Sequence, residues 1–143
     1  AYVARVLGRS EISRYPWSGK YPPSAVVGNF ADVRISDTLA ETVPGYDDRY
    51  RGSAPVGSFA AFPEGFYDLG GNVAEWMNDY YAVYPGESGQ LVEEPFGPEK
   101  GKHYVVRGSS WRHGNITELR LSYRDYSRVA RSDIGFRLAR YAN

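Results

Sequence analysis

Two carboxylates stand on either side of a glycine turn in the segment DLGGNVAEW. Asp68 precedes the paired glycines Gly70 and Gly71, and Glu75 follows them. Glycine lets backbone carbonyl groups approach a point that a side chain would otherwise block. Two carboxylates with nearby carbonyls form an all-oxygen ligand set, which suits Ca²⁺ and does not suit zinc. The same residues can instead cap the turn and the element that follows, and spacing alone leaves both interpretations open.

Two other groups of polar residues have simpler interpretations. Asp47 and Asp48 are neighbours in a segment rich in glycine and tyrosine, which is typical of a solvated turn. Ser109, Ser110 and His113 are close in the chain, but the sequence identifies no acid that would orient the histidine. A Ser-His-Asp nucleophile is therefore not predicted, because that arrangement needs all three partners.

Cysteine is absent from the 143 residues, and this absence removes whole classes of chemistry. Disulfides, thiolate metal ligands and a cysteine nucleophile are excluded for this sequence. A nitrogen-oxygen metal site can form from His103, His113 and Glu118 only if the fold brings them together. A lone histidine more often makes a structural hydrogen bond than a metal bond.

The formal net charge is zero, but the two signs are unevenly distributed. Residues 102–143 hold nine basic and three acidic side chains, and a basic tail that binds nucleic acid is one interpretation. Apolar residues such as Val105, Trp111 and Leu121 interrupt the basic positions. We therefore expect this segment to fold against the acidic remainder, without a nucleic-acid partner. No run of residues is long and apolar enough to span a membrane.

Strands that could position these groups are predicted at two places. Residues 103–107 read HYVVR, which is typical of a strand. Residues 134–140 alternate, and this pattern predicts a half-buried strand with Ile134, Phe136 and Leu138 facing inward.

Helices are predicted to be few and loops many. A short helix is expected over residues 2–8, and a second one from Asn72, as its cap, to about residue 79. Aromatic residues make 14–31 an ordered loop, and glycine and proline make 84–102 a surface loop. Such a fold has a high chain-entropy cost, so without disulfides it needs another staple, for which bound metal is the usual candidate.

Motifs in a fixed order make the chain recognisable. GFYDLGGNVAEW, YVVRGSSW, LRLSYR and DIGFRLARY resemble the formylglycine-generating enzyme family, also called the sulfatase-modifying factor domain. The upstream pieces RYPWSGKYPP, GNFAD and GYDDRYRGSAPVGSF agree, so the resemblance covers essentially the whole chain. It implies an α+β, variant C-type lectin-like fold that is loop-rich, has few short strands and helices, and is calcium-stabilised. Members usually have a further stretch upstream, so we expect residues 1–143 to be the C-terminal part of one such domain, with the N-terminal part missing.

Calcium is the structural cofactor that the resemblance implies, at two sites. The first, here called the 68–75 turn, would use the side chains of Asp68 and Glu75 with the carbonyls of Gly71 and Val73. The second, here called the 29–50 site, would use the side chains of Asn29 and Asp48 with the carbonyls of Phe30 and Tyr50.

Copper is the cofactor that the sequence argues against. The family's enzyme oxidises a cysteine in a sulfatase peptide with copper held by two cysteines. Here the corresponding segment is GSSWRHGNITE, in which His113 stands at the first cysteine position and residues 116–118 stand near the second. Soft Cu(I) selects thiolates. We therefore expect no copper site and no formylglycine generation by that mechanism.

Three arginines also occupy family positions: Arg120, Arg124 and Arg137. The planar guanidinium pairs well with carboxylates and carbonyls. We expect these side chains to stabilise the fold rather than to act on a ligand.

The function that these features favour is a calcium-stabilised module that binds a ligand or peptide, or that regulates a neighbouring module such as a kinase. The ligand surface would be the 110–118 loop, with the ligand-binding residues Ser110, Trp111, Arg112, His113 and Glu118. The partner would be a peptide, protein or small molecule. An enzyme of the same family with different chemistry, such as oxidoreductase-type maturation of a protein or metabolite, is the alternative. The sequence leaves the compartment open, although calcium favours an extracytoplasmic one.

Overall fold

A computed structural model describes residues 13–62, 64–83 and 97–138 of the chain. Its regular elements are the 3-10 helix η1 (Val33–Ile35) and the strands β1 (Ala74–Tyr80), β2 (Tyr104–Arg107), β3 (Arg124–Ser127) and β4 (Ile134–Gly135). Among these described residues, no helix is long and apolar enough to cross a membrane. The helix predicted at 2–8 and most of the loop predicted at 84–102 lie outside the described residues.

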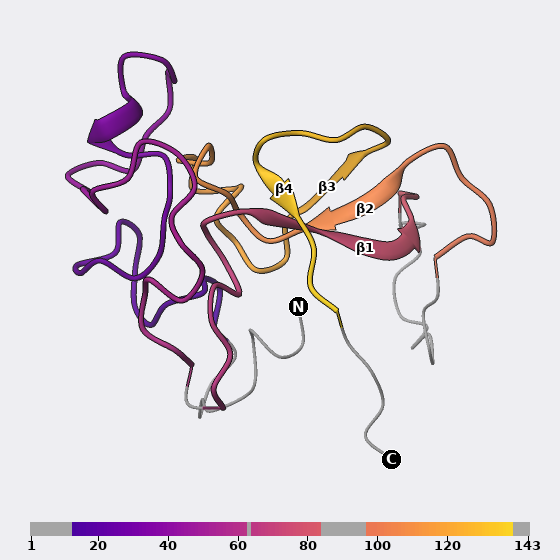
Figure 1. Ribbon diagram of the computed structural model, residues 1–143, viewed down its shortest axis with the longest axis horizontal. Coiled ribbons are helices and arrows are strands. Elements are labelled where there is room, and N and C mark those ends of the chain that lie inside the picture. The colour runs from indigo at the N-terminus through magenta and orange to yellow at the C-terminus, as the bar shows by residue number, and fades with distance from the viewer. Residues whose placement is uncertain (1–12, 63, 84–96, 139–143) are drawn as a thin grey trace.

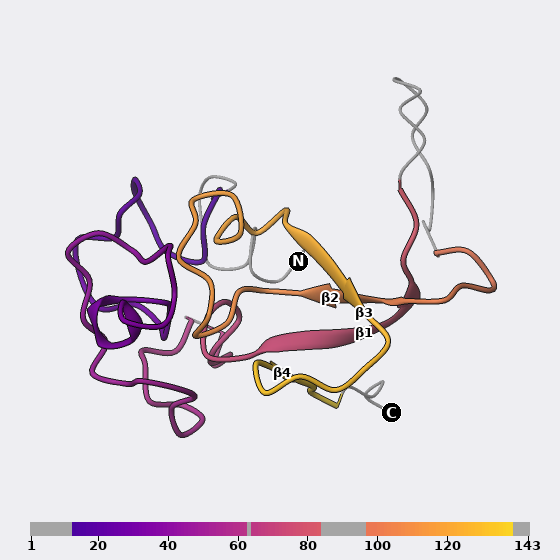
Figure 2. The same ribbon diagram turned by 90° about the horizontal axis from the view of Figure 1, so that it is seen from above.

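The four strands form one small curled sheet in the order β3-β2-β1-β4. β2 runs antiparallel to both β1 and β3, whereas β4 runs parallel to β1. Residues 13–62, coloured indigo to magenta, form an irregular lobe beside one end of this sheet (Figure 1). The view from above separates the lobe from the strands in the same way (Figure 2). The expected loop-rich fold with few short strands and helices is therefore observed, and the described residues contain almost no helix.

The irregular lobe has its own aromatic core. Its buried members are Tyr15, Trp17, Phe30, Val43 and Tyr46, and Leu119 from outside the lobe completes the cluster. The rings of Tyr15 and Trp17 stack with centroids 4.8 Å apart, which confirms that 14–31 is ordered loop. The Tyr46 hydroxyl donates to the Gly28 carbonyl at 2.6 Å and accepts from the Val27 and Gly28 amides. This tyrosine therefore fixes the backbone immediately before Asn29 by packing and hydrogen bonding together.

The helix predicted to start at Asn72 is wrong, because residues 74–80 form strand β1. Trp76 pairs with Val106 of β2, so pairing across the sheet decides the conformation of this segment. Asn72 caps no helix. Its backbone is left-handed, with a φ of 63°, and its side-chain amide bonds both backbone groups of Ala54, at 2.8 and 3.1 Å.

The strand predicted at 103–107 is confirmed as β2, whereas the one at 134–140 is much shorter than predicted. β4 ends at Gly135, and the side chains of Phe136 and Leu138 are 72% and 89% exposed instead of facing inward. Arg137 lies between them and reaches the Glu75 carboxylate. The alternating pattern failed here because the chain leaves the sheet after two residues.

Candidate functional site

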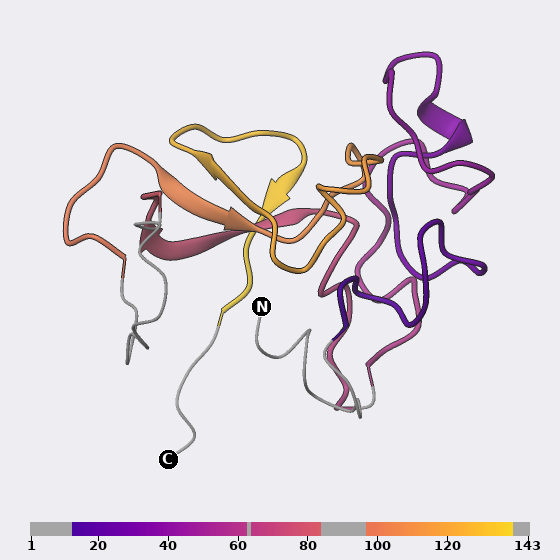
Figure 3. The same ribbon diagram turned by 180° about the vertical axis from the view of Figure 1, so that it is seen from behind.

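Three irregular segments, 29–31, 71–72 and 109–113, are joined backbone to backbone. From behind, residues 108–122 are seen returning from β2 to the irregular lobe (Figure 3). The four connecting bonds are Asn72 N to Asn29 O at 2.7 Å, Gly71 N to Ser109 O at 3.1 Å, Trp111 N to Asn72 O at 2.9 Å, and Ala31 N to His113 O at 3.0 Å. A Cβ at Gly71 would lie 2.9 Å from the Asn29 carbonyl oxygen, so this approach needs glycine.

Two buried polar side chains mark the 29–50 site. Asn29 is 1% exposed, and its Nδ2 donates to the Gly52 carbonyl at 2.8 Å and to Asn72 Oδ1 at 3.3 Å. Its Oδ1 is buried and has no hydrogen-bond partner. Asp48 is 3% exposed and accepts from two backbone amides, those of Phe30 at 2.9 Å and Tyr50 at 2.8 Å. An orphaned amide oxygen costs free energy that a bound cation would remove.

The Asp48 carboxylate is held in an unfavourable electrostatic environment. Burial, together with the nearby charges of Asp32 and Asp47, raises its pKa to about 6, although the two backbone amides act in the opposite direction. No ion pair joins Asp48 to a basic residue within the described chain. The Asp48 carboxylate accepts from the amide of the residue after Asn29, whose own Oδ1 has no partner. Both are oxygen donors of the kind that a hard cation prefers, so these residue types fit Ca²⁺.

The charges at the 68–75 turn are balanced differently from those at the 29–50 site. Asp68, Val73 and Glu75 line one small cavity of about 70 Å³. Arg137 Nε donates to both oxygens of the Glu75 carboxylate at 2.8 and 2.9 Å, and its Nη2 donates to the Tyr67 and Asp68 carbonyls, each at 3.2 Å. The bond with Glu75 raises the pKa of Arg137. The guanidinium therefore supplies a positive charge where the predicted calcium would supply one, so the fit to a metal is weaker than at the 29–50 site.

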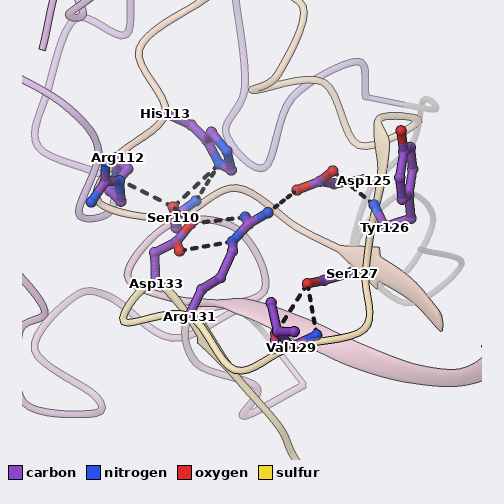
Figure 4. Close-up of polar contacts among 9 residues, drawn as sticks. All are labelled: Ser110, Arg112, His113, Asp125, Tyr126, Ser127, Val129, Arg131 and Asp133. Atoms are coloured by element: carbon purple, nitrogen blue, oxygen red, sulfur yellow. Dashed lines mark hydrogen bonds and ion pairs between the residues drawn. The ribbon is translucent and has the colours of Figure 1, made fainter. Parts of the chain in front are cut away.

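A buried polar cluster supports the 110–118 loop (Figure 4). The Ser110 hydroxyl, which is fully buried, donates to Asp133 Oδ2 at 3.1 Å. Arg131 reaches between two carboxylates, binding Asp133 at 3.1 Å through Nε and Nη2, and Asp125 at 2.9 Å through Nη1. Burial alone would raise the pKa of Asp133, but the bonds and charge of Arg131 outweigh it and lower that pKa below its usual value.

His113 is fixed in one neutral form. Its Nδ1 accepts from the Ser110 backbone amide at 3.0 Å, so the ring proton lies on Nε2. Burial lowers the pKa of this histidine despite the nearby charges of Glu118, Asp133 and Asp125. The acid touches the serine rather than the histidine, and the serine is buried. This cluster is therefore not a nucleophilic triad.

An open hollow of about 540 Å³ lies beside the loop. It is lined by Leu39, Arg112, His113, Arg131, Ser132 and Asp133. The Arg112 guanidinium lies 5.3 Å from the centre of the Trp111 ring and makes no hydrogen bond or ion pair with the described residues. Two of the five predicted ligand residues thus line the hollow. Ser110 lies behind it, and the Glu118 carboxylate instead accepts from the Asn115 amide at 3.4 Å.

Some predicted groupings are not brought together, and some residues were missed. His103 packs on Tyr126 with ring centres 5.0 Å apart, and no three His, Cys, Asp or Glu side chains in the described ranges could share a metal ion. Asp133 was missed because nothing in the spacing connects it with Ser110, 23 positions away. The adjacent Arg131 was the available signal, since unlike charges two positions apart in a loop can pair.

Two of the three family arginines make the structural contacts expected of them. Arg137 binds a carboxylate and two carbonyls, as described above. Arg124 donates to the Ala82 carbonyl at 3.0 Å and lies over the Tyr81 ring. The Arg120 side chain is exposed and donates to the nearby Thr117 carbonyl at 3.4 Å.

Comparison with known proteins now gives these residues a family. The family model described as the sulfatase-modifying factor enzyme 1-like domain matches residues 1–142. Formylglycine-generating enzyme of Thermomonospora curvata is 32% identical over 109 residues, which are 73% of this chain and 34% of that protein. Serine/threonine-protein kinase pkn1 of Chlamydia caviae is 37% identical over 91 residues, 62% of this chain and 15% of that protein.

A solved structure agrees with these sequence matches. PvdO from Pseudomonas aeruginosa superposes with a TM-score of 0.60 and 25% identity, over 94% of this chain and 47% of that one. The chain spans about a third or less of the length of the two curated relatives. Because the family model matches residues 1–142, the chain belongs to the sulfatase-modifying factor enzyme 1-like family, and its sequence contains no cysteine.

Proposed function

We propose that this chain is a calcium-stabilised ligand-binding module on a C-type lectin-like scaffold, and that it does not oxidise cysteine. The observation that carries the proposal is the state of His113, which stands at the family's first cysteine position. Its Nδ1 is already bonded to the loop backbone, and its ring lines an open hollow. This position would therefore face a ligand in the hollow, and it has no thiol for the oxidation.

Calcium would be held first at the 29–50 site. Asn29 and Asp48 would supply side-chain oxygens, and Phe30 and Tyr50 would supply carbonyls. The orphaned Asn29 oxygen and the raised pKa of Asp48 support this choice. Bound calcium would neutralise the buried carboxylate and fix the loops that lack regular structure. The 68–75 turn would bind calcium more weakly, because Arg137 already balances Glu75.

The ligand would be a peptide or small molecule that presents hydrogen-bond acceptors to the hollow. Arg112 offers an arginine fork with no hydrogen-bond or ion-pair partner among the described residues, and His113 offers a neutral Nε2–H. Both groups donate, so carbonyl or carboxylate oxygens are the matching chemistry. Trp111 adds an apolar surface beneath the guanidinium.

Selection of binders from a random peptide library tests this surface. We expect selected peptides to bind Arg112→Glu about tenfold or more weakly than wild type. The substitution replaces a cationic donor by an anionic acceptor, which repels the acceptor oxygens of the ligand. Lys102→Glu, at an exposed position before β2, is the matched control and should leave binding unchanged. Equal binding by wild type and Arg112→Glu would exclude the hollow as the ligand site.

A sulfatase-type peptide with a cysteine tests the enzymatic alternative. Incubation with copper and oxygen, followed by mass spectrometry, should show no conversion of the cysteine to an aldehyde. Appearance of the aldehyde would overturn the argument from the missing thiols.

A regulatory role beside a kinase is favoured by one specific observation, the 37% identity with a region of the protein named serine/threonine-protein kinase pkn1. In that case the hollow would bind a segment of a neighbouring module. Addition of the separate chain to such a kinase, with a change in its phosphorylation rate, is the measurement that supports this role.

A further inference from the structure

We propose that calcium at the 29–50 site sets the conformation of the 110–118 loop, and that Asn72 is the positioning residue that links the two. This inference rests on the calcium site proposed above. It adds a role for a residue that is neither a metal ligand nor part of the ligand surface.

The loop is attached at two points, Trp111 and His113, to residues next to the calcium site. Trp111 N donates to the Asn72 carbonyl at 2.9 Å, and Ala31 N donates to the His113 carbonyl at 3.0 Å. Ala31 directly follows Phe30, whose carbonyl would bind the metal. A shift of the 29–31 segment therefore moves one anchor of the loop, and a shift of Asn72 moves the other.

Asn72 determines which end of the Asn29 amide is left for the metal. The Ala54 amide donates to Asn72 Oδ1 at 2.8 Å, which fixes the orientation of the Asn72 side chain. The same Oδ1 then accepts from Asn29 Nδ2, whose other hydrogen goes to the Gly52 carbonyl. Both donors of Asn29 are thus used, so its Oδ1 is the atom left without a partner.

The backbone of Asn72 makes the same connection. Its amide donates to the Asn29 carbonyl at 2.7 Å while its own carbonyl accepts from Trp111. Asn72 is 3% exposed and has a left-handed φ of 63°, a conformation that asparagine tolerates better than most residues. One buried residue therefore carries side-chain and backbone bonds from the calcium site to the ligand loop.

Two unfavourable groups stand at the calcium site when no cation is bound. Within the described ranges, Asn29 Oδ1 lacks a partner, and the Asp48 carboxylate is buried without a positive charge. Local opening relieves both, because water can then solvate them. The same opening weakens the two anchors of the loop. Calcium should therefore slow the exchange of the amide hydrogens that form these anchors.

Hydrogen exchange followed by NMR on the full chain tests the coupling. With calcium instead of a chelator, we expect the amides of Ala31 and Trp111 to exchange about tenfold more slowly, a typical coupling between sites. The Leu121 amide, which donates to the Arg14 carbonyl at 2.9 Å, is an internal reference and should change much less.

Asn72→Gly tests the positioning role, because it removes the side-chain amide and still permits the left-handed backbone. Calcium affinity, measured by titration calorimetry, should fall about tenfold or more. Calcium should then no longer slow the Trp111 amide. Asn78→Gly makes the same change at an exposed position of β1 and is the control. Asn72→Asp keeps the Oδ1 acceptor and should retain most of the calcium effect, which supplies a readout if the glycine variant does not fold.

Each outcome decides between the two proposals. Calcium uptake with unchanged exchange at Ala31 and Trp111 would overturn the coupling and leave the calcium site intact. Undiminished calcium affinity in Asn72→Gly would overturn the role of Asn72. Absence of calcium uptake by the wild-type chain would remove the calcium site and, with it, this inference.

Discussion

The two acidic sites resemble each other in composition but differ in how their carboxylates are balanced. Asp48 is buried against backbone amides and lies near other acidic residues. Glu75 is bound at both oxygens by Arg137, which also reaches two carbonyls of the same turn. Among the described residues, the 29–50 site contains a negative charge without a counter-charge, whereas the 68–75 turn contains its own cation.

This difference shows that an all-oxygen ligand set does not by itself indicate need for a metal. At the 68–75 turn, Arg137 comes from the far end of the sequence and satisfies the set. At the 29–50 site, no such residue arrives from the part of the chain that the structure describes, and burial raises the pKa of Asp48 instead. Calcium should therefore contribute more to stability at the 29–50 site than at the 68–75 turn.

The largest effect should be the pH dependence of stability without calcium. The folded chain raises the pKa of Asp48 to about 6. Its stabilising contribution is therefore fully present below the unfolded pKa of about 4, and is lost as the pH rises through about 6. A shift of this size corresponds to about 3 kcal/mol over the whole interval from below pH 4 to pH 7, and about half of that falls between pH 5 and pH 7. Urea unfolding in a chelator should show the protein more stable at pH 5 than at pH 7.

Calcium should reverse this trend, because it binds the ionised carboxylate. Asp48→Asn in chelator should flatten the pH dependence above pH 5. Asp37, Asp47 and Asp133 have lowered pKa values, so their contributions are lost only as the pH falls through those lowered values. A chelated protein that is no less stable at pH 7 than at pH 5 would show that Asp48 is not the uncompensated charge.

The second largest effect should come from Arg137, which is the cation inside the 68–75 turn. Arg137→Gln should destabilise the fold by about 2 kcal/mol, because it leaves a largely buried carboxylate unpaired, although partial exposure of Arg137 limits the loss. Thermal unfolding measures the change, and Arg128→Gln at an exposed position is the control. Calcium should restore part of the loss by taking the place of the guanidinium. Unchanged stability with weakened ligand binding would contradict the structural role of Arg137.

The sequence predicted the pieces of this structure whose cause is local. The apolar run before Arg107 produced β2, and the aromatic residues around Trp17 produced an ordered lobe. The sequence-based prediction failed where contacts between distant residues decide the local conformation. Asn72 has the composition of a helix cap, but contacts with Ala54 and Asn29 hold it in a left-handed turn that leads into a strand.

The candidate site was predicted from motif order rather than from spacing. Motif order supplied the positions of Asn29, Asp48 and His113, whereas spacing alone gave Asp47 and Asp48 the character of a solvated turn. The supporting cluster around Asp133 was not predicted, because its bond to Ser110 depends on how β4 approaches the 110–118 loop. Hydrogen bonds between residues so far apart in the chain follow from the fold and leave little trace in a single sequence.

The smallest effect should come from the buried carboxylate Asp133, which tests whether an arginine is what separates the two acidic sites. Ser110→Ala removes one of its hydrogen bonds but leaves both bonds from Arg131. The expected loss in thermal unfolding is about 1 kcal/mol, the usual net value of one hydrogen bond. Ser109→Ala removes a neighbouring buried hydroxyl and should change stability less. If Ser110→Ala reduced the stability more than Arg137→Gln does, hydroxyl and amide donors would stabilise a buried carboxylate as well as an arginine does. Asp48, with two amide donors, would then need no calcium.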